Sequence, residues 1–299
     1  MTNIRKLKNV FILAGIFLIC SCSPKQVCTI KIAFDDGCTL EQQIAAYEVI
    51  SKRVAVWGVK EKTDLIDGKF DLTYVVGKEQ NSNSNTLLTQ ILTERGEIYI
   101  TEIYQQNEIQ SPRDMVYERL FLLIENAEHY PQWRMNGLQI NTQDLIKVPL
   151  EQVSYIDSIF NSFQRLFPAK MSFAWTEKPD REGFFALLPL KTLHKLPLNQ
   201  NTVKKSNIQN HGGHQGLFIE LHEEYIEEWA RMTRNNIDRS LAIVMDGRVL
   251  MYPRVNAEII GGRLTITGDF DNNEFALMKS VILGGVLECK AQIINQEMK

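Results

Sequence analysis

The chain has 299 residues, of which 44% are hydrophobic and 23% are charged. This composition is typical of globular proteins, and it excludes a disordered or fibrous chain. The formal net charge of −3 excludes a strongly basic surface that would hold nucleic acid by its phosphates. The one long apolar run lies at the N-terminus, so a transporter with several membrane spans is also excluded.

The N-terminal segment has the pattern of a signal peptide. The basic residues Arg5, Lys6 and Lys8 precede an apolar stretch of 11 residues at positions 10–20. This stretch is too short to cross a hydrocarbon core of ~30 Å as a helix, but it has the length of the apolar region of a signal peptide. We therefore expect this segment to direct the chain out of the cytoplasm.

The end of this segment resembles a bacterial lipobox. Ile19 lies three residues before Cys22, and the small residue Ser21 directly precedes that cysteine. We predict a signal peptide over residues 1–21, lipidation of Cys22, and a tether over residues 22–27. Two acyl chains on the mature cysteine would anchor the protein stably. The alternatives that stay open are an ordinary secretory signal peptide and an uncleaved anchor.

Three further cysteines follow at Cys28, Cys38 and Cys289. Their number allows one disulfide with one thiol left over, and the sequence leaves open whether such a bond forms. Their spacing fits no zinc motif. We expect these residues mostly to pack in the core.

The first part of the chain has a β-α-β-α-β pattern. Apolar residues recur three or four positions apart over residues 40–57, as on one face of a helix, and Gly58 is placed to end that helix. The polar stretch 81–85 indicates a loop, and a short helix is predicted at 86–93. The predicted strands of this part are residues 28–34, 70–76 and 97–103.

The middle of the chain has a different pattern. A helix predicted at 112–128 is apolar around most of its circumference, which indicates burial. Apolar residues at spacings of three and four over 153–167 predict one packed helix, which Pro168 ends. Two strands are predicted within residues 171–190, whereas the polar residues 198–215 indicate a loop.

The last part of the chain again alternates between strands and helices. Asp246 and Gly247 separate the apolar runs 241–245 and 249–253, and they predict a hairpin whose type I′ turn needs positive φ at both central residues. The run 241–245 is apolar throughout, as expected for a strand covered on both faces. The other predicted elements are strands at 217–221, 264–270 and 286–294 and helices at 226–233 and 275–282.

Several short motifs occur in a fixed order along the chain, among them LAIVMDGRV at 241–249 and ITG at 266–268. The individual positions are Arg53, Gly58, Gly96, Thr233, Asp246, Gly247, Pro253, Gly261, Gly262 and Gly268. In this order they resemble the first periplasmic domain of the SecD and SecDF protein-export factors, over nearly all of residues 28–294. Five of these positions also have a structural explanation: Asp246 and Gly247 form the turn, and Gly261, Gly262 and Gly268 suit positive φ or close backbone approach.

The resemblance implies an α+β fold. It implies a ferredoxin-like base subdomain, formed by residues 28–104 and 215–299 in one shared sheet, with an inserted α+β head subdomain at 105–214. In SecD, membrane helices follow this domain, and an acidic residue in them is thought to couple proton flow to export. No apolar stretch of ~20 residues follows the signal segment here. We therefore expect a lipid-tethered periplasmic domain that performs no proton-driven work.

The sequence contains no nucleophile elbow, P-loop, dinucleotide fingerprint or zinc-protease helix. We predict a protein of the cell envelope that is not an enzyme, has no cofactor or metal, and is held on the periplasmic side of a bacterial membrane by lipid alone. The resemblance implies that it binds unfolded polypeptide or translocon components, and no nucleic acid. The alternatives are a diverged envelope interaction module unrelated to export and, less favoured, a metal-dependent hydrolase centred on His211 and His214.

Overall fold

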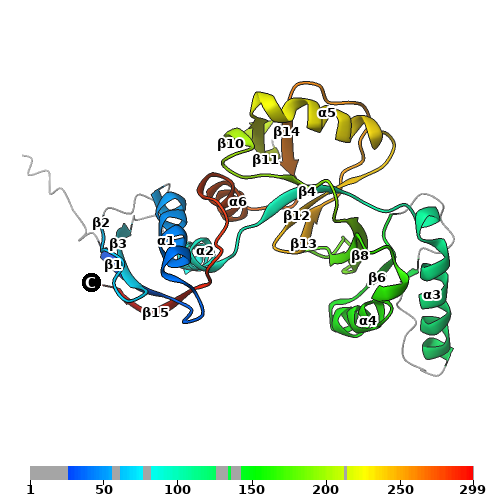
Figure 1. The fold of residues 1–299 in the computed structure, drawn as a ribbon, viewed down its shortest axis with the longest axis horizontal. Coiled ribbons are helices and arrows are strands. Elements are labelled where there is room, and N and C mark those ends of the chain that lie inside the picture. The colour runs from blue at the N-terminus through cyan, green and yellow to red at the C-terminus, as the bar shows by residue number, and fades with distance from the viewer. Residues whose placement is uncertain are drawn as a thin grey trace, which may run out of the picture.

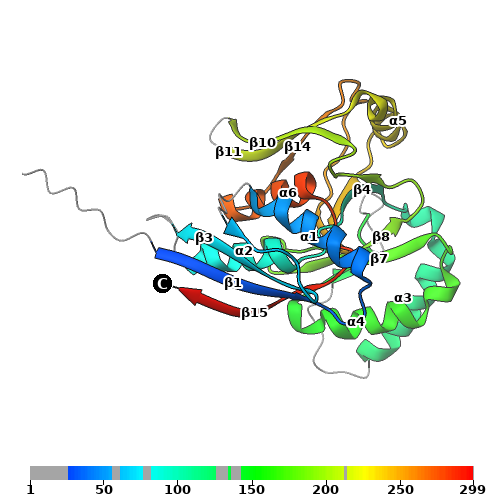
Figure 2. The same ribbon diagram turned by 60° about the vertical axis from the view of Figure 1, so that its left-hand side comes forward.

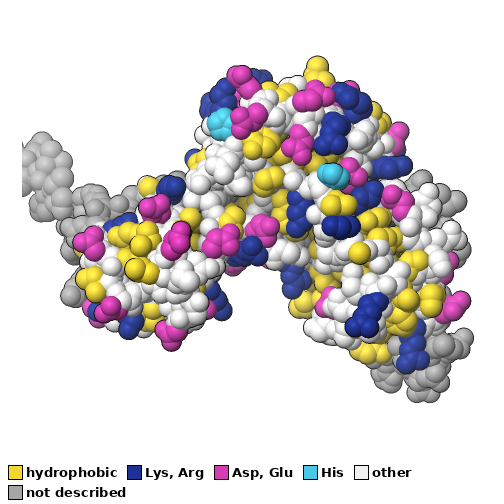
Figure 3. Space-filling view, in the orientation of Figure 1, with side chains coloured by type: hydrophobic (Ala, Val, Ile, Leu, Met, Phe, Trp, Pro, Cys, Tyr) yellow, Lys and Arg dark blue, Asp and Glu magenta, His cyan; other side chains and the backbone are white. Residues whose placement is uncertain are grey.

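The structure is a computed structural model that describes residues 26–55, 61–76, 82–125, 134–135, 143–211 and 214–298. Helices and strands occur together in every part of the molecule, so the predicted α+β class is confirmed (Figure 1). Acidic and basic side chains are interspersed over the described part of the visible face (Figure 3). Among the described residues, no helix combines the length and the apolar character that a membrane crossing requires.

The two ends of the chain pair in one antiparallel sheet of four strands, which we call the base sheet. Strand β1 (Gln26–Phe34) lies between β15 (Ala291–Met298) and β3 (Lys69–Val76), and β2 (Glu61–Lys62) pairs with β3. Alternate residues of β1 are buried, because one face of the sheet packs in the core that it shares with two helices. These helices are α1 (Leu40–Ala55) and α2 (Ser82–Thr93).

A second sheet of four strands, which we call the central sheet, has the order β13-β12-β4-β9. All five residues of β12 are buried. Leu241 and Ile243 face the core that includes the base helices, whereas Ala242 and Val244 face a separate core against β7 and β8. The prediction that this strand is covered on both faces is therefore confirmed. The strands are β13 (Arg248–Met251), β12 (Leu241–Met245), β4 (Ile98–Glu102) and β9 (Leu196–Pro197).

Two further lobes flank the central sheet (Figure 1). The upper lobe in that view combines the sheet β10-β11-β14 with helix α5, and the lower lobe combines the sheet β5-β6-β8-β7 with helices α3 and α4. The upper elements are β10 (Val203–His211), β11 (His214–Leu221), α5 (Ile226–Asn235) and β14 (Arg263–Thr267). The lower elements are α3 (Gln110–Glu125), β5 (Arg134–Met135), β6 (Ile146–Val148), α4 (Leu150–Ser162), β7 (Met171–Trp175) and β8 (Phe185–Lys191).

Helix α6 (Asn272–Gly284) connects these parts of the molecule. It contacts α1 and α2 on one side and β10, β11 and β4 on the other, and it lies between the base helices and the upper lobe (Figure 2). The described residues also contain three short 3-10 helices: η1 (Gln106–Glu108), η2 (Gln164–Leu166) and η3 (Glu223–Tyr225).

Two predicted loops are wrong. Residues 81–85 were expected to form a loop, but α2 begins at Ser82. Residues 198–215 contain strand β10, which pairs with β11. Strand β10 stands at the edge of its sheet, so most of its side chains need no apolar partner. Its sequence is therefore polar and lacks the apolar pattern by which a strand is recognised. Burial of the helix predicted at 112–128 was also overestimated, since Met115 is exposed.

The pairing of the two chain ends in one sheet is confirmed by β1 and β15. A single sheet for all strands of the predicted base is wrong, because β4, β11, β12 and β14 lie in two other sheets. The ferredoxin-like character of the base and the boundaries at 104/105 and 214/215 stay predictions. The signal peptide at 1–21, the lipidation site Cys22 and the motif residue Gly58 lie outside the described residues.

A disulfide joins Cys38, just before α1, to Cys289, just before β15. The two residues are 251 positions apart in the chain. The expectation that the cysteines mostly pack is confirmed, since Cys28 and Cys289 are buried in the core and Cys38 packs against it. The bond that the sequence left open is formed by Cys38 and Cys289, and Cys28 is a buried free thiol. The bond ties the N-terminal segment of the base to its C-terminal segment.

Reduction of this disulfide should lower the free energy of unfolding by about 3–5 kcal/mol, because the bond restricts the unfolded chain over a long loop. Urea denaturation of the oxidised and the reduced protein measures the difference. The Cys38→Ser, Cys289→Ser double variant is the control, since a reductant should leave its midpoint unchanged. Equal midpoints for the oxidised and the reduced wild-type protein would contradict the prediction.

Candidate functional site

Arg53 lies in the last turn of α1, and its side chain is 0% exposed. A buried charge is unfavourable unless its donors are paired, and here every guanidinium nitrogen donates to a backbone carbonyl. Nε and Nη2 donate to Gly285, Nε at 3.0 Å. Nη1 donates to Ile91 at 3.1 Å and to Glu94 at 2.7 Å. Nη2 also donates to Arg95 at 2.7 Å.

These carbonyls lie at the C-terminal ends of two helices. Ile91 is in the last turn of α2, and Gly285 directly follows α6. The last carbonyls of a helix lack partners within it and carry partial negative charge, so a cation stabilises them. Arg53 thus holds the ends of α1, α2 and α6 together, and the Ser280 hydroxyl of α6 donates in return to the Arg53 carbonyl at 3.0 Å.

Burial lowers the pKa of Arg53 to about 10, although the charges of Asp246 and Glu94 act in the opposite direction. The guanidinium therefore remains protonated at neutral pH. Two glycines leave it the space that it needs. A Cβ on Gly96 would lie 2.2 Å from Arg53 Nη2, and a Cβ on Gly284 would lie 2.3 Å from Arg53 Cγ. Gly96 was identified from the motif, whereas sequence reasoning missed this role of Gly284.

Asp246 connects the β12–β13 turn to the segment that leads from α2 into β4. Its φ of 48° and the φ of 80° at Gly247 confirm the predicted turn, in which both central residues have positive φ. Its Oδ2 accepts from the Gly96 amide at 2.8 Å, and its Oδ1 accepts from the Glu97 amide at 2.7 Å. Asp246 was predicted only as a turn residue, and this second role was missed.

Glu94 is partly buried beside this turn. Burial raises the pKa of Glu94, and so do the charges of Asp246 and Glu177 and a hydrogen bond with the Asp246 carboxylate, while Arg53 lowers it. The residues that meet here, which we call the Arg53 junction, are Arg53, Glu94, Gly96, Asp246 and Gly284.

The motif glycines of the upper lobe differ from one another. Gly262 has a φ of 61°, and a Cβ there would lie 2.6 Å from Ile226 Cγ1. Gly268 has a φ of 151°, and a Cβ there would lie 2.9 Å from the ring of Phe270. The prediction of positive φ or close approach is therefore confirmed for these two. It is wrong for Gly261, where φ is not positive and no heavy atom lies within 4 Å of an added Cβ.

The other two motif residues lie around α5. The Thr233 hydroxyl donates to the Trp229 carbonyl at 3.1 Å and accepts from the Ile259 amide at 2.9 Å, so it fastens the loop after β13 to the helix. Pro253 lies at the start of that loop. Both residues line one cavity, between α5 and the central sheet.

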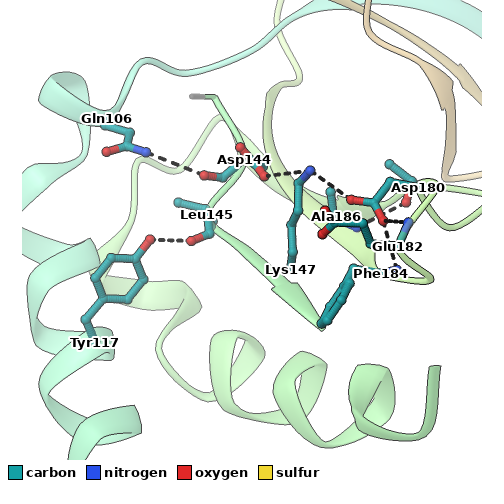
Figure 4. Close-up of polar contacts among 10 residues, drawn as sticks. Gln106, Tyr117, Asp144, Leu145, Lys147, Asp180, Glu182, Phe184 and Ala186 are labelled. Carbon is teal, nitrogen blue, oxygen red and sulfur yellow. Dashed lines mark hydrogen bonds and ion pairs between the residues drawn. The ribbon is translucent and has the colours of Figure 1, made fainter. Parts of the chain in front are cut away.

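A polar cluster that the sequence did not indicate lies in the lower lobe (Figure 4). Lys147 Nζ is 3.1 Å from Asp180 Oδ2 and 4.0 Å from Asp144 Oδ2. Asp180 also accepts from the amides of Glu182 and Phe184 at 3.0 and 3.1 Å. Partial burial lowers the pKa of Lys147, but the hydrogen bond to Asp180 and the charges of Tyr252, Asp144 and Asp180 together outweigh burial and leave that pKa raised. The lysine stays charged and paired, an arrangement that suits structural support.

The backbones of His211 and His214 are paired across the β10–β11 hairpin, and their side chains lie outside the described part of the structure. The described residues contain no group of three or more His, Cys, Asp or Glu side chains placed to hold a metal ion.

Stability should depend on pH through Glu94. Because its pKa in the folded protein lies above the ordinary 4.5, the folded state holds this proton more tightly than the unfolded chain. The resulting stability is fully present below pH 4.5 and is lost as the pH rises through the folded-state pKa. Glu94→Gln should remove that loss, so the variant should gain stability relative to wild type as the pH rises from about 4 to 8.

Urea denaturation at a series of pH values measures this difference. Glu223→Gln, at an exposed residue of η3, corrects for the general effect of removing one negative charge. A difference between Glu94→Gln and wild type that stays constant over the whole pH range would contradict the assignment.

Residues 194–289 match the family model described as SecDF, P1 head subdomain. The protein translocase subunit SecD of Acidaminococcus fermentans is 31% identical over 83 residues, which cover 28% of this chain and 20% of that protein. The corresponding subunit of Rhodothermus marinus is 26% identical over 137 residues, which cover 44% of this chain and 22% of that protein. The chain thus spans about a fifth of the length of these relatives. The segment matched by the family model, residues 194–289, extends across the predicted subdomain boundary at 214/215.

The fold is similar to a crystal structure of SecDF in a super-membrane-facing form, with a TM-score of 0.52 and 16% sequence identity. The similarity covers 91% of this chain and 30% of that one, and at this identity it concerns the fold alone. The chain therefore resembles the periplasmic P1 domain of SecD and SecDF, in sequence over residues 194–289 and in its fold, as the ordered motif residues predicted.

Proposed function

We propose that this protein takes part in protein export as a periplasmic interaction module that binds secreted polypeptide or a component of the translocon. The match of residues 194–289 to the P1 head subdomain of SecDF is the observation that carries the proposal. The disulfide between Cys38 and Cys289 supports a place outside the cytoplasm, because such bonds persist in oxidising compartments.

The polar groups of the fold favour binding over catalysis. The Arg53 guanidinium donates to backbone carbonyls, and Lys147 is paired with carboxylates. Both side chains therefore stabilise the fold, and neither activates a nucleophile. Strands β10 and β15 stand at the edges of their sheets. Backbone groups along a sheet edge are sites to which an extended polypeptide adds as a further strand.

We also propose that lipid on Cys22 anchors the protein to the membrane. The lipobox supports this, and strand β1 begins at Gln26, four residues later. Four residues extend over at most ~14 Å, so a lipid at this position would keep the base sheet next to the membrane surface.

Photo-crosslinking in cells tests the export role. The crosslinking residue replaces Ile260 of the upper lobe, which is 74% exposed, or Leu40 of the base, which is 68% exposed and serves as the matched control. While a secretory precursor is held in the translocon, the probe at position 260 should give adducts with the precursor or with translocon subunits. These adducts should disappear when export is blocked before the precursor enters the translocon.

Adducts confined to unrelated envelope proteins, or adducts indifferent to the block, would contradict the export role and favour the stand-alone module. The same cells carrying Cys22→Ser test the anchor, because this variant should leave the membrane fraction. A Cys22→Ser protein that still incorporates labelled fatty acid would reject Cys22 as the lipidated residue.

A further inference from the structure

Strand β15 forms an open edge of the base sheet. It pairs with β1 on one side, and no described strand pairs with its other side, so it is the outermost strand there (Figure 2). The carbonyl of Lys290 accepts from the Asp35 amide at 3.1 Å, so the pairing with the N-terminal segment begins just before the strand. The backbone N–H and C=O groups along such an edge are the groups to which a further strand binds.

This strand lacks the side chains by which proteins usually protect a long edge. It has eight residues without lysine or proline, and Glu297 near its end is its one charged residue. The other edge strands differ: β2, β5 and β9 have two residues each, and the segment after β7 is bridged to β13. Strand β10 carries the exposed Lys204 and Lys205, and β14 begins with the exposed Arg263. Charged side chains of this kind discourage pairing with another chain.

A β-bulge in β15 decides which strand fits this edge. The register with β1 shifts between Lys31 and Ile32, which leaves Ile294 as an extra residue. Gln292 and Asn295 therefore lie on the same face of the sheet, because the β1 residues opposite them are two positions apart. A regular strand loses the match of faces across such a bulge, whereas an antiparallel strand with the same bulge keeps it. Strand β15 of a second copy is a strand of this kind.

The charges beside the bulge fit the same pairing. When the two bulges face each other across a two-fold axis, Gln292 lies opposite Asn295 of the second copy, and the exposed Lys290 lies opposite the exposed Glu297. A shift of the second strand by two residues places Glu288 opposite Glu297 in one direction and Gln292 opposite Glu297 in the other. Of these three registers, the first alone pairs opposite charges, and the symmetry forms that pair twice.

We propose that this edge binds a second copy of the chain, through antiparallel pairing of the two β15 strands about a two-fold axis at the bulge. Each Lys290 pairs with Glu297 of the other copy. The Ile294 side chains, each 52% exposed in the single chain, lie next to the axis and become shielded from water. The two base sheets join into one continuous sheet. This dimer does not rest on the proposed export function.

Disulfide crosslinking in cells tests the register. The full-length protein is produced in two differently tagged copies, one with Gln292→Cys and the other with Asn295→Cys. Residues directly opposite each other have Cβ atoms about 4.5–5.5 Å apart, close to the separation in a disulfide, so mild oxidation should join the two copies. Gln292→Cys combined with Glu297→Cys is the matched control for a shifted register, and it should give little of this product.

Charge reversal tests the ion pairs. Lys290→Glu and Glu297→Lys each place like charges opposite each other at two symmetric positions, so each should lower the crosslinked fraction about 5- to 30-fold. The double variant exchanges the two charges and should restore the crosslinked fraction, because both pairs return with reversed sign. Lys52→Glu, the same change at an exposed position of α1, is the control and should leave the fraction unchanged.

A crosslinked fraction no higher than that of the shifted-register control would overturn the proposal. A double variant as weak as the single charge reversals would overturn it as well. Adducts of the cysteine at position 292 with an extended secretory polypeptide, in place of a second copy, would also overturn the dimer and would assign the β15 edge to that polypeptide.

Discussion

The guanidinium of Arg53 is the interaction on which the arrangement of this molecule depends. It is the point where three helices end, and one of them, α6, contacts both the base helices and the upper lobe. Burial of its charge costs several kcal/mol, and the carbonyl acceptors around it offset that cost only while all of them stay in place. The absence of side chains at Gly96 and Gly284 follows from this constraint, since a Cβ on Gly96 would collide with the guanidinium and a Cβ on Gly284 would collide with Cγ of Arg53.

The central sheet connects the residues around Arg53 to the rest of the molecule. Asp246 fastens its β12–β13 turn to the segment that supplies two of the carbonyls bound by Arg53. The same sheet forms the floor of the cavity under α5 and, on its other face, packs against the lower lobe.

Local patterns predicted the local structure well. The Asp246-Gly247 hairpin followed from the demand for positive φ, and the doubly covered β12 followed from its uninterrupted apolar run. Most of what failed depended on distant partners. An arginine on a helix is normally exposed, and the carbonyls that bury Arg53 are 38 to 232 residues away in the chain. The pairing of Cys38 with Cys289 and the unpartnered indole of Trp229 likewise depend on tertiary structure, which spacing alone does not encode.

The most direct test of this account is the free energy of unfolding of Arg53→Met, with Arg95→Met as the control. Both substitutions remove a guanidinium and keep a long apolar side chain, but the Arg95 side chain is exposed. The account predicts a loss of about 3–5 kcal/mol in Arg53→Met, because buried carbonyls of Ile91, Glu94, Arg95 and Gly285 lose their donor. It predicts a change within about 0.5 kcal/mol in Arg95→Met. Equal stabilities of the two variants would contradict the central role of Arg53.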